Sequence, residues 1–196
     1  MQRRALAAAL ALTAGAVIVA AQEDRPKSPR GSAETQIGPN WIEISYGRPI
    51  KRGRSDIFGT GADYGKKLDA GAPVWRAGAN VSTRLKTSIP LQIGGKPVPA
   101  GEYSLFIDLE PNNWTLIVSS WGAKASGKDP NKEALWGAYN YTPDKDVARA
   151  PMALTTLPFS IDQLTWVFTD VTEAGGKLTL MWDTVAASAP FTAAKS

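Results

Sequence analysis

Hydrophobic and polar residues alternate along most of the chain with a period of two. Ile42, Ile44 and Tyr46 alternate with Glu43 and Ser45, a pattern typical of a β-strand with one buried face. The same alternation recurs in the segments 81–88, 103–107, 114–118, 164–168 and 178–182. About nine short strands with little helical periodicity predict an all-β protein, a single-domain antiparallel β-sandwich that is jelly-roll-like and carries two long loops.

Turn residues separate these strands at the expected places. Glycine pairs stand at 94–95 and 175–176, and Pro111-Asn112-Asn113 joins two alternating segments. Glycine and asparagine supply the positive φ that tight hairpins need. We therefore predict a hairpin of strands 103–108 and 114–119. One helical turn is predicted at 130–135, with Asp129 as its cap.

The same alternation assigns some of the seven tryptophans to the core. Trp114, Trp166 and Trp182 share strand faces with leucine, valine and phenylalanine, which predicts that all three are buried. Trp41 falls on the face opposite Ile42. Apolar residues also occupy the second face of several strands, so part of a sheet is expected to be covered on both sides: Phe106, Ile117, Val167 and Met181.

The N-terminus has the pattern of a secretory signal peptide. Arg3 and Arg4 precede an apolar run over residues 5–20, and small residues lead to a predicted cleavage after Ala21. A retained membrane anchor is the alternative, but the run is shorter than the ~20 residues of a membrane span. Export to the periplasm or the cell exterior is therefore expected. The predicted divisions are a signal peptide, a flexible leader, a β-sandwich domain and a C-terminal tail, at 1–21, 22–32, 33–185 and 186–196.

Composition narrows the chemistry that is available. The 196 residues contain neither histidine nor cysteine. Disulfides, thiolate nucleophiles, the usual zinc sites and histidine-containing catalytic triads are thus excluded. We expect no metal and no cofactor, and a non-catalytic role is favoured over an enzyme. Two of the basic residues behind the net charge of +4 lie in the predicted signal peptide, so nucleic acid is not an expected partner.

Two long loops interrupt the β pattern, at 47–80 and 120–136. Loops longer than about 15 residues in a compact domain are usually functional or disordered, and both contain tryptophan. The first opens with a basic cluster that would suit an anion, although a solvated loop is the favoured interpretation: Arg48, Lys51, Arg52 and Arg54. Asp144 and Asp146 are interpreted as turn residues rather than calcium ligands.

These loops supply the candidate ligand site. Arginine can hold a carboxylate or phosphate with two parallel hydrogen bonds, asparagine offers a donor and an acceptor, and aromatic rings offer stacking area. The predicted binding residues are Arg48, Trp75, Arg76, Asn80, Trp136 and Tyr139. Their expected partner is an unknown small anionic molecule or a glycan. The structural alternative is that these side chains only bond loop carbonyls or pack the loops onto the sheet.

Two further functions stay open at this point. A hydrolase of an envelope glycan would need a pair of carboxylates in one cleft, and no spacing in the sequence selects such a pair. A protein-interaction module would instead show a large exposed apolar patch.

Several longer motifs resemble a known family. They are Ile57-Phe58-Gly59, Tyr64-Gly65-Lys66, Pro73-Val74-Trp75-Arg76-Ala77-Gly78-Ala79-Asn80, Pro99-Ala100-Gly101-Glu102-Tyr103-Ser104-Leu105-Phe106, Trp114-Thr115-Leu116-Ile117-Val118, Trp136-Gly137-Ala138-Tyr139 and Asp146-Val147-Ala148-Arg149. In this order they are similar to the secreted bacterial family known as domain of unknown function 2911, over roughly residues 28–184. The resemblance implies an exported single domain and carries no activity. Extra residues near 67–72 and 123–134 depart from the family pattern and lengthen the two loops.

Overall fold

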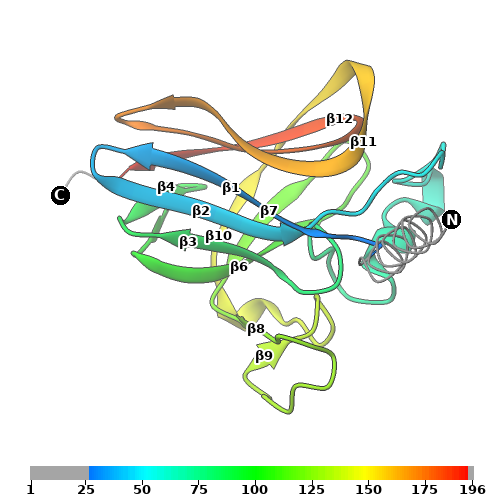
Figure 1. Cartoon of the computed structure of the whole chain (residues 1–196), viewed down its shortest axis with the longest axis horizontal. Coiled ribbons are helices and arrows are strands. Elements are labelled where there is room, and N and C mark those ends of the chain that lie inside the picture. The colour runs from blue at the N-terminus through cyan, green and yellow to red at the C-terminus, as the bar shows by residue number, and fades with distance from the viewer. Residues whose placement is uncertain (1–26, 194–196) are drawn as a thin grey trace, which may run out of the picture.

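The computed structural model describes residues 27–193 and consists mainly of two antiparallel sheets (Figure 1). The larger sheet has the order β1-β2-β3-β6-β7-β10, with bounds Arg30–Ile37, Asn40–Gly47, Thr83–Thr87, Gly101–Asp108, Thr115–Ser119 and Asp146–Pro151. The smaller sheet has the order β11-β12-β4-β5, with bounds Ala153–Thr172, Gly175–Ala193, Leu91–Ile93 and Lys96–Val98. The all-β prediction is confirmed with two antiparallel sheets, whereas jelly-roll connectivity stays a prediction.

Short elements complete the described chain. β8 (Gly122–Ala123) and β9 (Ala134–Leu135) form a small parallel pair. Within residues 27–193, the α-helix is α2 (Lys66–Asp69), and two 3-10 turns are η1 (Gly61–Asp63) and η2 (Pro143–Lys145). Among the described residues, no helix has the length and apolar character needed to cross a membrane.

The two sheets enclose one hydrophobic core to which the alternating residues contribute. Trp114, Trp166 and Trp182 are at most 1% exposed, as their strand faces predicted. Trp182 stacks on Trp75 with ring centroids 6.3 Å apart, and Phe58 lies 4.9 Å from Trp114 in a tilted arrangement. Aromatic contacts of this kind add to the free energy gained from buried apolar area. The core is thus built on large rings from both sheets and the first loop.

The predicted hairpin is present as β6 and β7. Its register pairs Phe106 with Ile117, and Asn112 in the connecting turn has a φ of 60°, which asparagine tolerates better than most residues. Phe106 and Ile117 are fully buried although they face away from the main core. They are covered on the outer face of the larger sheet, as expected for a strand that is apolar on both sides. Val167 and Met181, in contrast, are only half-buried.

The predicted helical turn at 130–135 is wrong. The Asp129 carboxylate accepts hydrogen bonds from the backbone N–H of Ala125 and of Asn131, and Asn131 Oδ1 accepts one from the N–H of Glu133. These side chains therefore stabilise successive turns instead of capping a helix. The chain then enters β9, where Leu135 is buried against Phe106 and Ile117.

The predicted domain bounds of 33 and 185 are too narrow. β1 begins at Arg30, inside the predicted leader. β12 continues through the predicted tail as far as Ala193. Ala187, Ala189 and Phe191 are buried there. Small residues allow close packing of this segment, whereas its composition alone indicated a C-terminal tail. The predicted signal peptide, residues 1–21, lies outside the described residues.

Candidate functional site

In the structure the two long loops extend further than predicted, from β2 to β3 (48–82) and from β7 to β10 (120–145), and they meet on the outer face of the larger sheet. There they cover Phe106 and Ile117 with a second hydrophobic cluster, to which the first loop contributes Val74 and the second loop Leu135, Ala138 and Tyr141. The Tyr139 hydroxyl donates a 3.1 Å hydrogen bond to the carbonyl of Ala70, which joins one loop to the other. We call this junction the loop seam and define it as Asp69, Ala70, Arg76, Asn80 and Tyr139.

Three of the six predicted binding residues belong to the loop seam. The Arg76 guanidinium lies over the ring of Tyr139, 5.7 Å from its centroid. Arg76 Nη1 also donates a 3.3 Å hydrogen bond to the backbone carbonyl of Asn80. Asn80 and Tyr139 are exposed, and Arg76 is half-buried. No carboxylate among the described residues pairs with Arg76, so part of its hydrogen-bonding capacity faces solvent.

Trp75 does not belong to the site, and its prediction as a binding residue is wrong. Its side chain is 1% exposed and stacks on Trp182 in the main core. Its backbone exchanges hydrogen bonds of 2.8 and 2.9 Å with Ile107, which fixes the segment to β6. The residue before Arg76 therefore anchors the loop and points away from the seam.

The rest of this motif also fastens the first loop to the core. The carbonyl of Ala77 accepts hydrogen bonds from Trp166 Nε1 at 3.0 Å and from Thr83 Oγ1 at 3.1 Å. The loop packs so closely on the end of β2 that a Cβ on Gly47 would lie 2.0 Å from the carbonyl oxygen of Ala79. Only glycine fits at position 47, and most of the motif has a structural role.

Arg48 also lies elsewhere, and the prediction that it joins the site is wrong. Its guanidinium donates to the carbonyl of Leu164 and to Thr165 Oγ1, both at 3.4 Å. An added Cβ on Gly31 would lie 2.3 Å from its side chain. Arg48 therefore fills the space between β1 and β11, where it satisfies polar groups of the smaller sheet.

Two further members of the basic cluster, Lys51 and Arg54, likewise bind the scaffold, whereas Arg52 is exposed. Lys51 pairs with Asp183, and Arg54 donates to the carbonyls of Ile50 and Lys51 while lying over the Trp182 ring. The hydrogen bond with Lys51, helped by one from Ser160, lowers the pKa of Asp183 against the opposing effect of burial. Such pairing favours the structural interpretation of the cluster over an anion site.

Trp136 lies beside the loop seam, but the aromatic ring under the Arg76 guanidinium is that of Tyr139. It is half-buried, and its ring packs near Gly127, where an added Cβ would lie 3.6 Å away. Its neighbour Gly137 does touch the seam, because a Cβ there would lie 2.9 Å from Arg76 Nη1. The Trp136 ring therefore supports the second loop from within.

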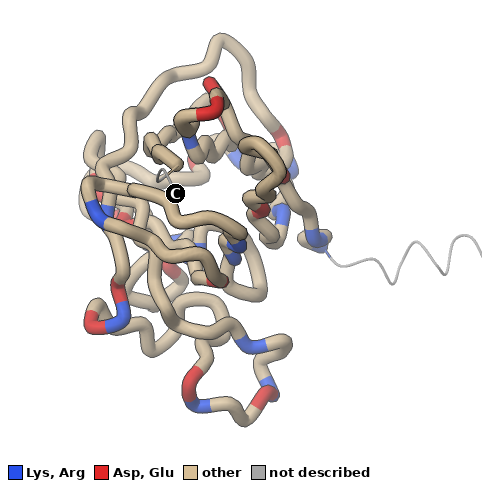
Figure 2. The backbone as a smooth tube through the Cα atoms, turned by 90° about the vertical axis from the view of Figure 1, so that its left-hand side faces the viewer, with Lys and Arg blue, Asp and Glu red and all other residues tan. Residues whose placement is uncertain are grey.

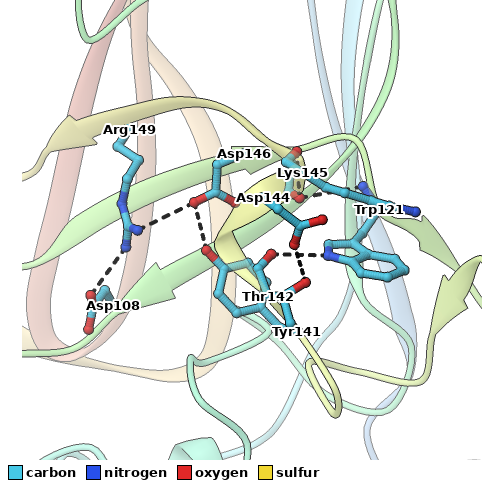
Figure 3. Close-up of polar contacts among 9 residues, drawn as sticks. Asp108, Trp121, Tyr141, Thr142, Asp144, Lys145, Asp146 and Arg149 are labelled. Carbon is cyan, nitrogen blue, oxygen red and sulfur yellow. Dashed lines mark hydrogen bonds and ion pairs between the residues drawn. The ribbon is translucent and has the colours of Figure 1, made fainter.

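A network of charged residues that the sequence analysis missed lies on the same outer face (Figure 3). Arg149 on β10 bridges two carboxylates, with Nη2 3.3 Å from Asp108 Oδ2 and Nη1 3.3 Å from Asp146 Oδ2. The Tyr141 hydroxyl donates a 2.7 Å hydrogen bond to the same Asp146 oxygen. Asp146 thus holds the second loop against β10, a role that the turn interpretation did not include.

Burial changes the acidity of this network. It raises the pKa of Asp146, against the lowering effects of Tyr141 and Arg149. The pKa of Tyr141 is also raised, first by burial and then by the adjacent carboxylate. One carboxylate oxygen of Asp146 is buried without a hydrogen-bond partner. The site therefore contains a carboxylate whose charge is only partly compensated.

Asp69 at the end of α2 is the most perturbed acid. Burial, followed by repulsion from Asp108, raises its pKa to about 6. Its Oδ1 atom is buried without a hydrogen-bond partner. Burial and the charge of Asp108 therefore both disfavour the ionised form of Asp69.

The far end of the second loop is closed by a separate group of contacts (Figure 3). Trp121 Nε1 donates a 3.1 Å hydrogen bond to the carbonyl of Thr142, and Lys145 Nζ lies 3.8 Å from the centroid of the Trp121 ring. Lys145 also pairs with Glu133 at 3.0 Å. Trp121 therefore packs the loop onto the sheet, as the structural interpretation of loop tryptophans predicted.

Basic and acidic residues are interspersed along the backbone (Figure 2). Within residues 27–193, no group of three or more acidic side chains is arranged to hold a metal ion.

A family comparison extends over almost all of the described chain. The model of the family described as "Protein of unknown function (DUF2911)" matches residues 28–191. The chain belongs to this family. No curated protein and no solved structure is significantly similar to the DUF2911 chain.

The missed residues differ in the signal they carry in the sequence. Asp69 lies in the extra stretch near residues 67–72, and Asp108 resembles an ordinary polar residue at a strand end. Asp146 and Arg149 belong to one of the motifs that resemble the family, but that motif does not indicate their partners. Strand alternation does place Asp108 and Phe106 on one face of β6. The pairing with β7 and β10 needed to bring Arg149 beside Asp108 follows only from the three-dimensional strand order.

Proposed function

We propose that this DUF2911 protein is an exported, non-catalytic binding module for a small anionic or glycan-like ligand, with its site at the loop seam. The observation that carries the proposal is the placement of Arg76 over Tyr139 and beside Asn80, without a carboxylate partner among the described residues. A held guanidinium has lost part of its conformational entropy before a ligand arrives. The charged N-terminal segment followed by an apolar run supports export.

Arg76 can bind an anion with its remaining donors. A carboxylate or phosphate accepts two parallel hydrogen bonds from one guanidinium. The exposed amide of Asn80 and the half-exposed ring of Tyr139 offer hydrogen bonding and stacking at the rim. This combination recognises one acidic group on a small polar molecule.

The experiment is an NMR titration of the mature chain with inorganic phosphate, acetate and glucuronate. We expect saturable shifts at the Arg76 and Tyr139 side chains for at least one of these probes. Arg76→Ala should weaken binding about tenfold, equivalent to one charge-assisted hydrogen-bonding contact. Arg76→Lys should recover part of it, because lysine keeps the charge but loses the two-pronged geometry.

Arg52→Ala is the matched control, since Arg52 is exposed on the same loop and touches only the carbonyl of Lys27. Unchanged affinity of Arg76→Ala, or equal losses in both variants, would contradict a site at the seam.

Asp69 and Asp108 favour a second candidate function, a carboxylate-dependent hydrolase of an envelope glycan. An acid with a pKa of about 6 beside a carboxylate held by Arg149 has the acid–base asymmetry that glycoside hydrolysis uses. A panel of chromogenic glycosides and peptidoglycan fragments tests it. Turnover that is lost in Asp69→Asn supports this candidate, whereas turnover unaffected by that substitution assigns the activity elsewhere.

A further inference from the structure

The part of the larger sheet's outer face that the long loops leave uncovered is a polar surface formed by β1, β2, β3 and β6, and its groove lies over the last three of these strands. The register pairs Glu43 with Lys86, and Lys86 with Glu102. Residues paired in this way point to the same side of a sheet. The three charged side chains therefore form a row across the strands, on the face that the two long loops leave open.

A second row lies beside the first. It contains Ser45, Arg84 and Ser104, which are paired across the same three strands. The rows are two residues apart along each strand, a spacing of about 7 Å. A groove of about 240 Å³ lies over both rows and is lined by Glu43, Ser45, Arg84, Leu85, Lys86 and Glu102.

Arg84 is fixed at the floor of this groove. Its Nη1 donates hydrogen bonds of 2.8 Å to Ser104 Oγ and 2.9 Å to the carbonyl of Trp121. Its Nη2 lies 3.9 Å from Glu102, beyond a normal hydrogen bond. These bonds fix the orientation of the planar guanidinium. The directions of its remaining N–H donors are therefore fixed as well.

The other charged side chains of the groove, Lys86, Glu102 and Glu43, are free to change partners. Lys86 lies 3.6 Å from Glu102, and both side chains are more than half exposed. Glu43 has no ion-pair partner among residues 27–193. Exposed ion pairs of this kind contribute little to stability, so a ligand can replace them at low cost.

Trp41 extends the surface along β2 with an aromatic ring. It lies on the same face as Glu43 and is 54% exposed, while its neighbour Ile42 is fully buried. Its backbone N–H donates to Ser88 Oγ at 2.9 Å, and its carbonyl accepts from the same hydroxyl at 3.1 Å. The backbone at Trp41 is therefore held while the indole stays available.

We propose that this surface binds a neutral oligosaccharide strand that lies along β2 from Trp41 towards Ser45. The four charged residues that line the groove, Glu43, Glu102, Arg84 and Lys86, carry no net charge. On the neighbouring strand β1, Glu34 pairs with Glu43 and is balanced by Arg30, whose Nη2 donates a 3.2 Å hydrogen bond to Ser45 Oγ. This balance disfavours both polyanions and polycations. Sugar hydroxyls can donate to Glu43 and Glu102 and accept from Arg84 and Lys86. The exposed indole offers an apolar platform for the C–H face of a sugar ring. This inference is independent of the anion site at the loop seam.

The test is an NMR titration of the mature chain with the neutral sugars cellohexaose and chitohexaose. For at least one sugar, we expect saturable shifts that include the Trp41 indole N–H and are confined to β2, β3 and β6. Trp41→Ala and Glu43→Gln should each weaken binding, the former by about tenfold. Because Trp41 and Glu43 contribute little to the core, far-UV circular dichroism should be unchanged in both variants.

Two matched controls separate this site from other surfaces. Phe159→Ala removes an aromatic ring of similar exposure, 60%, from β11 of the smaller sheet, and should leave sugar binding unchanged. Arg76→Ala should also leave it unchanged, which distinguishes this site from the loop seam. Absence of shifts with both sugars would overturn the proposal. So would full binding by Trp41→Ala, or concentration-dependent shifts without sugar that reveal a second copy of the chain on this face.

Discussion

The inner and outer faces of the larger sheet use the same strands for different purposes. On the inner face, Ile42, Leu85 and Leu105 pack with the tryptophans of the core and are fully buried. On the outer face, the loops cover Phe106 and Ile117, while Arg84 and Glu43 face a groove. Hydrophobic burial dominates the free energy of the inner face. The outer face instead carries the perturbed acids and the available donors.

Two adjacent residues show this contrast within one motif. Trp75 enters the core and Arg76 lies on the loop seam, although both were predicted from their residue type to bind a ligand. The burial of Trp75 shows that an aromatic residue in a long loop can anchor that loop to the core. Its polar neighbour is the better candidate for chemistry.

The largest effect is expected on the inner face, from Trp114→Ala. The side chain is fully buried, and its Nε1 donates a 2.7 Å hydrogen bond to the Tyr64 hydroxyl. We expect the free energy of unfolding to fall by about 3–5 kcal/mol in a urea titration. Trp114→Phe should lose less, because it keeps most of the apolar volume. A loss below about 1 kcal/mol for Trp114→Ala would contradict the claim that hydrophobic burial dominates the free energy of the inner face.

Arg149→Ala tests the covered part of the outer face. The substitution leaves Asp108 and Asp146 without their shared cation, and we expect a loss of about 1–2 kcal/mol at pH 7 after allowance for the partial exposure of Arg149. The loss should shrink towards pH 4, because the pKa of Asp146 is raised and its protonation removes the uncompensated charge. Urea titrations of both proteins at the two pH values measure the difference. A loss that is independent of pH would contradict an electrostatic origin.

Asp69→Asn should stabilise the protein slightly at pH 8. The folded-state pKa of about 6 lies above the ordinary value of 3.8 for an aspartate, so the folded state binds the proton more tightly than the unfolded state. The stability that this proton provides is present below pH 4 and is lost as the pH rises to about 6. We expect a gain of about 1 kcal/mol at pH 8 and none at pH 3. Thermal unfolding across this range checks the sign, and a destabilised variant at pH 8 would refute it.

The smallest effect is expected from Trp41→Ala on the open part of the outer face. More than half of the side chain is exposed, so the free energy of unfolding should change by no more than about 0.5 kcal/mol. The same urea titration measures it. A loss approaching that of Trp114→Ala would show that Trp41 is a structural residue and not an available platform.

Alternation along the strands predicted the inner face well. The hairpin of β6 and β7, the burial of Trp166 and the covered second face at Phe106 agree with the predictions from the period of two and the turn residues. The helix prediction at 130–135 failed because hydrogen bonds from Asp129 and Asn131 stabilise turns instead. The prediction of a C-terminal tail at 186–196 failed because the small residues of this segment pack closely within β12, which extends to Ala193.

The candidate site was predicted only in part. Arg76, Asn80 and Tyr139 do come together, because both loops cross the same sheet face. Asp69 and Arg149 could not be selected from the sequence, since their proximity to Asp108 depends on strand order and loop path. Residue type indicated which chemistry was available, and three-dimensional position decided which residues can perform it.

The most direct test of the account is a parallel urea titration of Trp75→Ala and Arg76→Ala. The two residues are neighbours in the chain, but one lies in the inner core and the other on the outer loop seam. We expect the free energy of unfolding to fall by about 3–5 kcal/mol in Trp75→Ala and by less than about 1 kcal/mol in Arg76→Ala. Equal losses, or a larger loss for Arg76→Ala, would contradict the division of the motif into an anchor and an available cation.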